Sequence, residues 1–131
     1  YRSIPDLAHN FVLQAVFEAQ PAPAEEMERL LAAARAKRKL SQPVGASAGC
    51  IFKNPEEIPA GRLIDELGLK NACVGDACVS DVHANFIINR GHARARDITI
   101  LIDMIRKEAM ENRGIDLKSE AQVIGDREPQ F

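Results

Sequence analysis

The stretch Asn71–Asn89 reads "NACVGDACVSDVHANFIIN", and it decides the fold class. It contains two short β-rich runs, "NACVGDACVS" and "HANFIIN", with turn-forming residues between them. Short strands that follow one another across turns pair in antiparallel fashion. The stretch therefore predicts successive strands of a mainly antiparallel sheet.

Helical patterns lie on both sides of these strands. Ala95–Asn112 carries an apolar stripe and is followed by Gly114, which suits a helix end. Residues 59–70, "PAGRLIDELGLK", place their apolar residues on one face and stop at Gly68. Ala24 to about Lys39 forms a third amphipathic pattern. Interleaved short strands and helices predict a single α+β domain, with helices packed on a mainly antiparallel sheet.

Three further segments carry weaker signals. Asn10–Ala19, "NFVLQAVFEA", alternates well enough to predict a strand, which Pro21 and Pro23 then end. The small residues of "SQPVGASAG" (41–49) predict a loop. The run "AQVIG" (121–125) predicts a last strand.

Composition excludes several classes of protein. The 131 residues are 46% hydrophobic and 27% charged with a net charge of −2, which is typical of a globular domain and offers no basic field for nucleic acid. No apolar run is long enough to span a bilayer. Three cysteines without C-x-x-C spacing argue against a disulfide framework and a zinc site. We therefore expect a cytoplasmic protein without a metal ion or a membrane partner.

Cys50, in "SAGCIFKNP" (47–55), is the first candidate for chemistry. A single cysteine is most often a small buried apolar residue. Gly45 and Gly49, however, allow a ligand to approach the backbone closely, which a core position does not require. A thiol with a pKa near ~8.5 could donate a proton to a carbanion, or act as a nucleophile with a histidine base. The residues alone leave these alternatives open.

Five other residues are candidates with an equally ordinary alternative. Lys53 and Asn54 form a donor-rich pair at a chain bend, which could hold an oxyanion or a phosphate. Glu120 precedes the predicted last strand, where it could be an acid or a solvent-facing side chain. Arg2 and His83 have the same ambiguity.

The motifs, taken in order, resemble one family. They are "YR" at the start, "QP…SAGCIFKNP", "AGRLIDELGLK", "VGDACVSDVHANFIIN" and "GIDLKSEAQVIG". Together they cover nearly the whole chain and resemble the UDP-N-acetylenolpyruvoylglucosamine reductases of bacterial peptidoglycan synthesis, in the shorter subtype that carries "HANF".

The resemblance implies a flavoenzyme that uses FAD and NADPH to reduce UDP-N-acetylglucosamine enolpyruvate to UDP-N-acetylmuramate. Residues 1–22 would be the last strand of the FAD-binding region, and residues 23–131 the C-terminal substrate-binding domain. The family's glycine-rich flavin segment has no counterpart here, so we expect a piece of a longer enzyme that is inactive alone. Its partners would be the substrate and the FAD-binding part of the same protein.

The resemblance also implies roles for individual residues. Arg2 matches the catalytic arginine, and Glu120 matches the glutamate that stabilises the enolate-like intermediate. Cys50 stands where most members have a serine that donates the proton, and a thiol is the stronger acid. Gln122 replaces an arginine found in many members, which alters local pairing.

Substrate contacts follow from the same resemblance. Asn54 matches a residue that contacts the diphosphate, with Lys53 as a supporting charge. His83 stands where the longer subtype has a substrate-contacting glutamine. Two other functions are compatible with the residue types: a stand-alone UDP-sugar-binding module, and a cysteine hydrolase that pairs Cys50 with His83.

Overall fold

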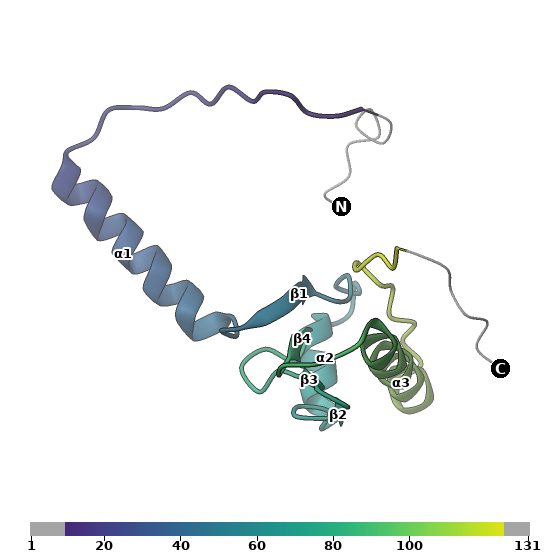
Figure 1. Ribbon diagram of the computed structural model, residues 1–131. Helices are drawn as coiled ribbons and strands as arrows, with labels where there is room; N and C mark the ends of the chain where they lie inside the picture. The colour runs from purple at the N-terminus through teal and green to yellow at the C-terminus, as the bar shows by residue number, and fades with distance from the viewer. Residues whose placement is uncertain (1–9, 125–131) are drawn as a thin grey trace. The chain divides into compact units, whose positions relative to one another are not determined.

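The structure is a computed structural model, which describes residues 10–124 (Figure 1). The chain divides into two compact units, residues 1–33 and 34–131. Among the described residues, no helix is long and apolar enough to cross a membrane.

The first unit contains an extended segment, residues 10–23, and the beginning of helix α1 (Ala24–Ser41). The predicted helix is confirmed, and its acidic first turn and basic last turn complement the helix dipole. The predicted strand Asn10–Ala19 is wrong, since the structure forms no strand there. A strand needs a neighbouring strand to take up its backbone groups, and no described segment pairs with this one.

The second unit contains a four-stranded antiparallel sheet of order β1-β4-β3-β2. The "NACVGDACVS" run forms a hairpin of two strands rather than a single strand, and "HANFIIN" supplies β4. The strands are β1 (Ala46–Cys50), β2 (Cys73–Val74), β3 (Ala77–Val79) and β4 (Phe86–Asn89). The predicted antiparallel sheet is thus confirmed.

Two predictions for the edges of this sheet are wrong. Residues 46–49, expected in a loop, belong to β1. Such small residues have a low strand propensity, but the hydrogen bonds to β4 hold them in a strand. The last strand expected at residues 121–125 is absent from residues 121–124, and the nearest pairing is an isolated bridge between Phe52 and Ser119. Gly125 lies outside the described residues.

Helices α2 (Ala60–Glu66) and α3 (Ala95–Arg113) confirm the other two helical patterns. Gly68 and Gly114 have φ angles of 71° and 66°, the left-handed conformation that ends a helix. Both helices contact each other, and α3 contacts β2 and β3. Figure 1 shows them beside the sheet.

One hydrophobic core joins the sheet to α2 and α3. The sheet contributes the face that carries Ala77, Val79 and Ile87. The helices contribute buried aliphatic side chains from their apolar stripes: Leu63, Ile64, Leu101, Ile102 and Ile105. This packing confirms the predicted α+β class, with helices on an antiparallel sheet.

The cysteine count and spacing argue against a disulfide framework, but the structure contains one disulfide. Cys73 and Cys78 form a disulfide between β2 and β3. The two residues are direct partners in the antiparallel register, on either side of the Gly75–Asp76 turn, so their side chains leave the same face. An odd cysteine count does not exclude one such local pair.

Glu66 links the two packed helices electrostatically. Its carboxylate accepts from Arg62 at 2.8 Å within α2 and from Arg113 at 3.2 Å at the end of α3. The hydrogen bond from Arg62, helped by the charges of both arginines, lowers the pKa of Glu66 from its ordinary value of 4.5.

We expect this linkage to make the free energy of unfolding depend on pH. Because folding lowers the pKa of Glu66, its stabilisation is complete above pH 4.5 and is lost as the pH falls through the folded-state pKa. Glu66→Gln should therefore weaken the loss of stability on acidification, measured by urea unfolding at a series of pH values. The difference should shrink in high salt, because the carboxylate is exposed. Equal pH dependence in both proteins would contradict it.

Candidate functional site

The segment Cys50–Asn54 lies between two other parts of the chain. On one side, the Ile51 N–H donates to the Asn85 carbonyl at 2.9 Å. On the other side, the Lys53 N–H donates to the Lys118 carbonyl at 2.9 Å. These hydrogen bonds fix the backbone of the segment on both sides, and so they fix the positions from which its side chains extend.

A β-bulge decides which way Cys50 faces. Ser47 pairs with Ile88 and Cys50 pairs with Phe86, so β1 has one residue more than β4 in this interval. Positions 47 and 50 of a regular strand would face opposite sides, but the extra residue puts both on the same side. Gly49, with φ 79°, takes the left-handed conformation within the bulge.

The bulge keeps Cys50 out of the core. Without it, Cys50 would share the face of Ile87, which packs against the helices. In the structure Cys50 is exposed and is not part of the disulfide. The alternative that Cys50 is a buried apolar residue is therefore wrong.

Glu120 lies beside the Cys50 segment. Its N–H donates to the Ile51 carbonyl at 2.7 Å, and the Ala121 N–H donates to the same oxygen at 3.3 Å. The Glu120 side chain is exposed, as is that of Cys50. Two predicted site residues that are 70 positions apart are therefore on adjacent backbone segments.

Asn54 connects the segment to α2. Its Oδ1 accepts from the Ala60 N–H at 3.0 Å, and so satisfies one of the backbone donors at the start of this helix. Lys53 is exposed beside it. The carboxamide thereby fixes the bend between the segment and the helix.

His83 lies against the first turn of α2. Its Nδ1 accepts from the Asn85 N–H at 3.1 Å, and its ring meets Phe86 edge-on at 5.0 Å between centroids. A Cβ added at Gly61 would come within 2.6 Å of His83 Cε1. A larger residue at position 61 would therefore require the imidazole to shift.

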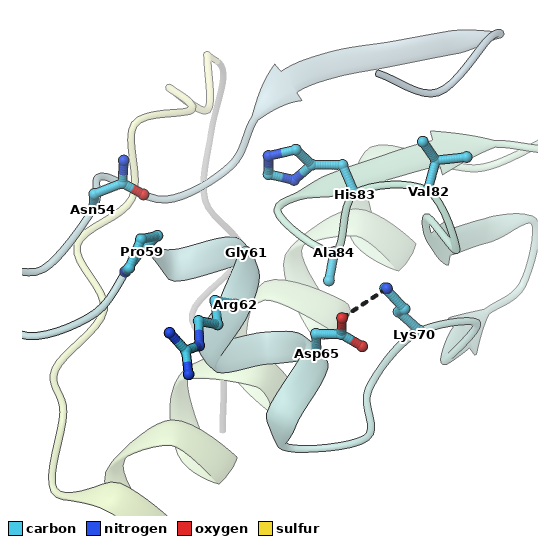
Figure 2. A pocket seen from close by; sticks show the side chains of 9 residues that line it. All are labelled: Asn54, Pro59, Gly61, Arg62, Asp65, Lys70, Val82, His83 and Ala84. Carbon is cyan, nitrogen blue, oxygen red and sulfur yellow. Dashed lines mark hydrogen bonds and ion pairs between the residues drawn. The ribbon is translucent and has the colours of Figure 1, made fainter. Parts of the chain in front are cut away.

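Asn54 and His83 meet at one pocket of about 310 Å³ (Figure 2). Figure 2 shows the imidazole extending over the start of α2, and the Lys70–Asp65 ion pair of 2.7 Å at the other side of the pocket. The lining also includes Pro59, Gly61, Arg62, Val82 and Ala84. Amide, imidazole, guanidinium and ammonium groups suit a ligand rich in acceptor oxygens.

The structure thus divides the predicted site residues into two groups. Asn54 and His83 line the pocket, whereas Cys50, Lys53 and Glu120 belong to the neighbouring backbone ladder and are outside its lining. Arg2 lies outside the described residues. Within residues 10–124, no group of three or more metal-ligating side chains gathers.

Sequence reasoning missed four residues of this region: Gly61, Arg62, Lys70 and Asn85. Two of them carry a recognisable signal. Gly61 is a glycine inside a helical pattern, which suggests a close approach. Asn85 is an amide at the start of an apolar strand, where a polar group needs a partner.

We expect Gly61→Ala to destabilise the protein through the His83 ring alone. The clash should lower the free energy of unfolding by about 1–3 kcal/mol. In a His83→Ala background the same substitution should instead stabilise the helix by up to about 1 kcal/mol, because alanine is the better helix former. Urea unfolding of the four proteins in this cycle measures the coupling. Equal effects of Gly61→Ala in both backgrounds would show that the ring is not the obstacle.

Residues 39–124 match the family described as "UDP-N-acetylenolpyruvoylglucosamine reductase, C-terminal domain". The chain belongs to the UDP-N-acetylenolpyruvoylglucosamine reductase family. The matched residues include the Cys50–Asn54 segment, the pocket and Glu120. The resemblance inferred from the motifs is confirmed.

Curated relatives support the assignment. The reductase of Syntrophobacter fumaroxidans is 42% identical over 125 residues, which cover 95% of this chain and 36% of that protein. The reductase of Geotalea uraniireducens is 43% identical over 126 residues, covering 95% and 42%. The chain therefore spans about two fifths of the length of the family members it matches.

A solved family member has the same fold. The crystal structure of the reductase from Thermus caldophilus superposes with a TM-score of 0.67 at 45% sequence identity. The superposition covers 79% of this chain and 36% of that one. It matches the α+β architecture described above.

Proposed function

We propose that this chain is the substrate-binding and proton-donating part of a flavoenzyme. The enzyme reduces UDP-N-acetylglucosamine enolpyruvate to UDP-N-acetylmuramate with NADPH, in the cytoplasm, as a step of peptidoglycan synthesis. Residues 1–22 would belong to the FAD-binding region and residues 23–131 to the substrate-binding domain. Support comes from membership of the reductase family and from the arrangement of the candidate site.

One observation carries the proposal. The hydrogen bond of 2.7 Å from the Glu120 N–H to the Ile51 carbonyl puts a carboxyl side chain beside the residue that follows Cys50. The side chains of Cys50 and Glu120 are exposed, so both can reach a substrate that lies over these two segments. An acid beside a thiol suits a reaction in which negative charge develops and is then quenched by a proton.

The described residues do not fit FAD as its main binding site. The pocket of about 310 Å³ is at the small end of ligand sites, and its lining suits a sugar phosphate rather than a dinucleotide. FAD would be bound by the remainder of the enzyme. There, once reduced by NADPH, it would supply a hydride to the methylene carbon of the substrate.

The residues of this chain would complete the reduction. The adjacent carbon gains the electron pair of the double bond, which is delocalised as an enolate onto the carboxylate. Glu120, as a carboxylic acid that donates a hydrogen bond, would stabilise this charge, and the fixed charge of Arg2 would hold the carboxylate. The Cys50 S–H would then give its proton to that carbon, and the thiolate would take a proton back from water. The hydride thus converts the methylene carbon to a methyl group, and the proton adds to the adjacent carbon to complete the reduction.

The substrate's UDP portion would occupy the pocket. Asn54 and His83 would face the diphosphate or sugar, with Lys53 as a nearby charge. Arg62 and Lys70 add cationic groups at the rim, although each is already paired with a carboxylate of α2. Their phosphate contacts would therefore compete with Glu66 and Asp65.

A reductase assay in D₂O tests the proposal on the full-length protein that carries this chain. We expect NADPH oxidation that depends on the enolpyruvyl substrate, and a product with solvent deuterium at the carbon next to the new methyl group. A hydrolase would consume no NADPH. Absence of substrate-dependent NADPH oxidation in a flavin-loaded protein would overturn the proposal.

The second candidate, a UDP-sugar-binding module without catalysis, is favoured by one observation: the pocket is lined by groups that suit a ligand, whereas Cys50 and Glu120 lie outside its lining. Calorimetry with UDP-N-acetylglucosamine on the 131-residue chain, after circular dichroism has shown that it folds, separates the two. Binding without catalysis by the full-length protein would favour the module. Binding that appears only in the full-length protein would favour a divided active site.

A further inference from the structure

Asn85 makes an unusual set of contacts with the Cys50–Asn54 segment. It is 3% exposed. Its Oδ1 accepts from the Phe52 N–H at 2.9 Å, and its Nδ2 donates to the Phe52 carbonyl at 2.8 Å. Its own carbonyl accepts from the Ile51 N–H. One buried amide therefore satisfies both backbone groups of Phe52, as a neighbouring strand would.

The side chain acts where the sheet ladder stops. The regular pairing of β1 with β4 ends at Cys50 and Phe86, after a bulge that has already disturbed it. Beyond this point, the Asn85 carboxamide takes the place of the next ladder bonds. Phe52 is two residues from Cys50 and two from Asn54, so fixing its peptide groups fixes the backbone under both.

The same residue also orients His83. The backbone N–H of Asn85, which alanine or aspartate at this position would also supply, donates to His83 Nδ1 at 3.1 Å. The ring is held over Gly61 and against Phe86. Asn85 thereby contacts the two segments that supply Cys50, Asn54 and His83.

We propose that Asn85 is a positioning residue: its side chain sets the Cys50–Asn54 segment in the geometry that the substrate requires, next to the His83 ring that its main chain contacts. This inference rests on the proposed function, in which those side chains contact the substrate. Asn85 itself is buried and does not touch the substrate. Catalytic geometry must hold within about 0.5 Å, so a buried amide whose oxygen and nitrogen are both hydrogen-bonded to one residue suits this task.

The test compares Asn85→Ala with a matched core variant in the full-length protein. Ile105→Ala removes a buried side chain of α3, 1% exposed, and leaves every Asn85 contact in place. Both variants are assayed well below their unfolding temperatures. We expect Asn85→Ala to lower kcat by about 100-fold and to raise KM, because a displacement near 1 Å has this effect on turnover. Ile105→Ala should stay within about twofold of the parent protein.

Asn85→Asp keeps the test meaningful if Asn85→Ala does not fold. It retains the acceptor for the Phe52 N–H but, when ionised, has no donor for the Phe52 carbonyl. Its kcat should therefore rise toward that of the parent as the pH falls and the carboxyl regains a proton. A pH profile parallel to that of the parent would overturn the inference.

A second readout needs no turnover. The rate at which iodoacetamide labels Cys50, measured by peptide mass spectrometry, reports the surroundings of its thiol. We expect the pH profile of labelling to change in Asn85→Ala and not in Ile105→Ala. If the parent protein has no reductase activity, the proposed function fails and labelling still tests the role of Asn85. If the parent is active and both variants behave alike in kcat and labelling, only the role of Asn85 fails.

Discussion

Replacing Cys50 by alanine in the full-length reductase should lower kcat by about 10²–10⁴-fold, while reduction of the flavin by NADPH continues at the parent rate. The reason is that the variant lacks the acid that protonates the substrate carbon after hydride transfer. Flavin bleaching in stopped flow measures the reduction of the flavin by NADPH, and steady-state turnover measures the complete cycle. Substrate binding should persist, since Cys50 is outside the pocket lining.

Two variants serve as controls for Cys50→Ala. Cys50→Ser restores an O–H at the same place and should recover much of the lost turnover. Ser47→Ala changes an exposed side chain on the same face of β1 and should leave kcat within about twofold. Near-normal turnover of Cys50→Ala would remove Cys50 from the mechanism.

Replacing Phe52 by alanine should lower the free energy of unfolding by about 3–5 kcal/mol. Phe52 is 1% exposed and belongs to the core formed by the sheet and the helices. Its loss leaves a cavity under the Cys50–Asn54 segment, whose backbone is held by Asn85 and bridged to Ser119. We therefore expect lower turnover as well as lower stability.

Urea unfolding of the full-length protein measures the stability change, with Ile100→Ala as the control. Ile100 lies on α3, 40% exposed, so its truncation should change the free energy of unfolding by less than about 1 kcal/mol. Similar losses in the two variants would show that Phe52 is not a main contributor to the core.

The helices could be predicted from the sequence because their signals are local. These signals depend on residues only a few positions apart. They are the apolar stripe of Ala95–Asn112, the glycines at 68 and 114, and the pattern after Pro23. The sheet edges could not be predicted in this way. Ala46–Cys50 is a strand only because β4 pairs with it. Residues 10–23 form no strand because no described strand pairs with them.

The candidate site shows the same division. The motifs are enough to select the candidates Cys50, Asn54, Glu120 and His83. Their spacing along the chain does not predict which way Cys50 faces or that Glu120 lies close to the Cys50 segment. The bulge at Gly49 decides the first, and the backbone bond to Ile51 decides the second. Both depend on segments distant in the chain.

The sequence by itself determined the family, the α+β class and the residue types that could supply a proton, an acid and phosphate contacts. The tertiary structure alone decided the Cys73–Cys78 pairing, the close approach of the His83 ring to Gly61 and the hydrogen bonds between Asn85 and Phe52. The physical reason is one of range. Helix periodicity and caps act within a few residues, whereas strand register, buried hydrogen bonds and close approaches form only when distant segments pack together.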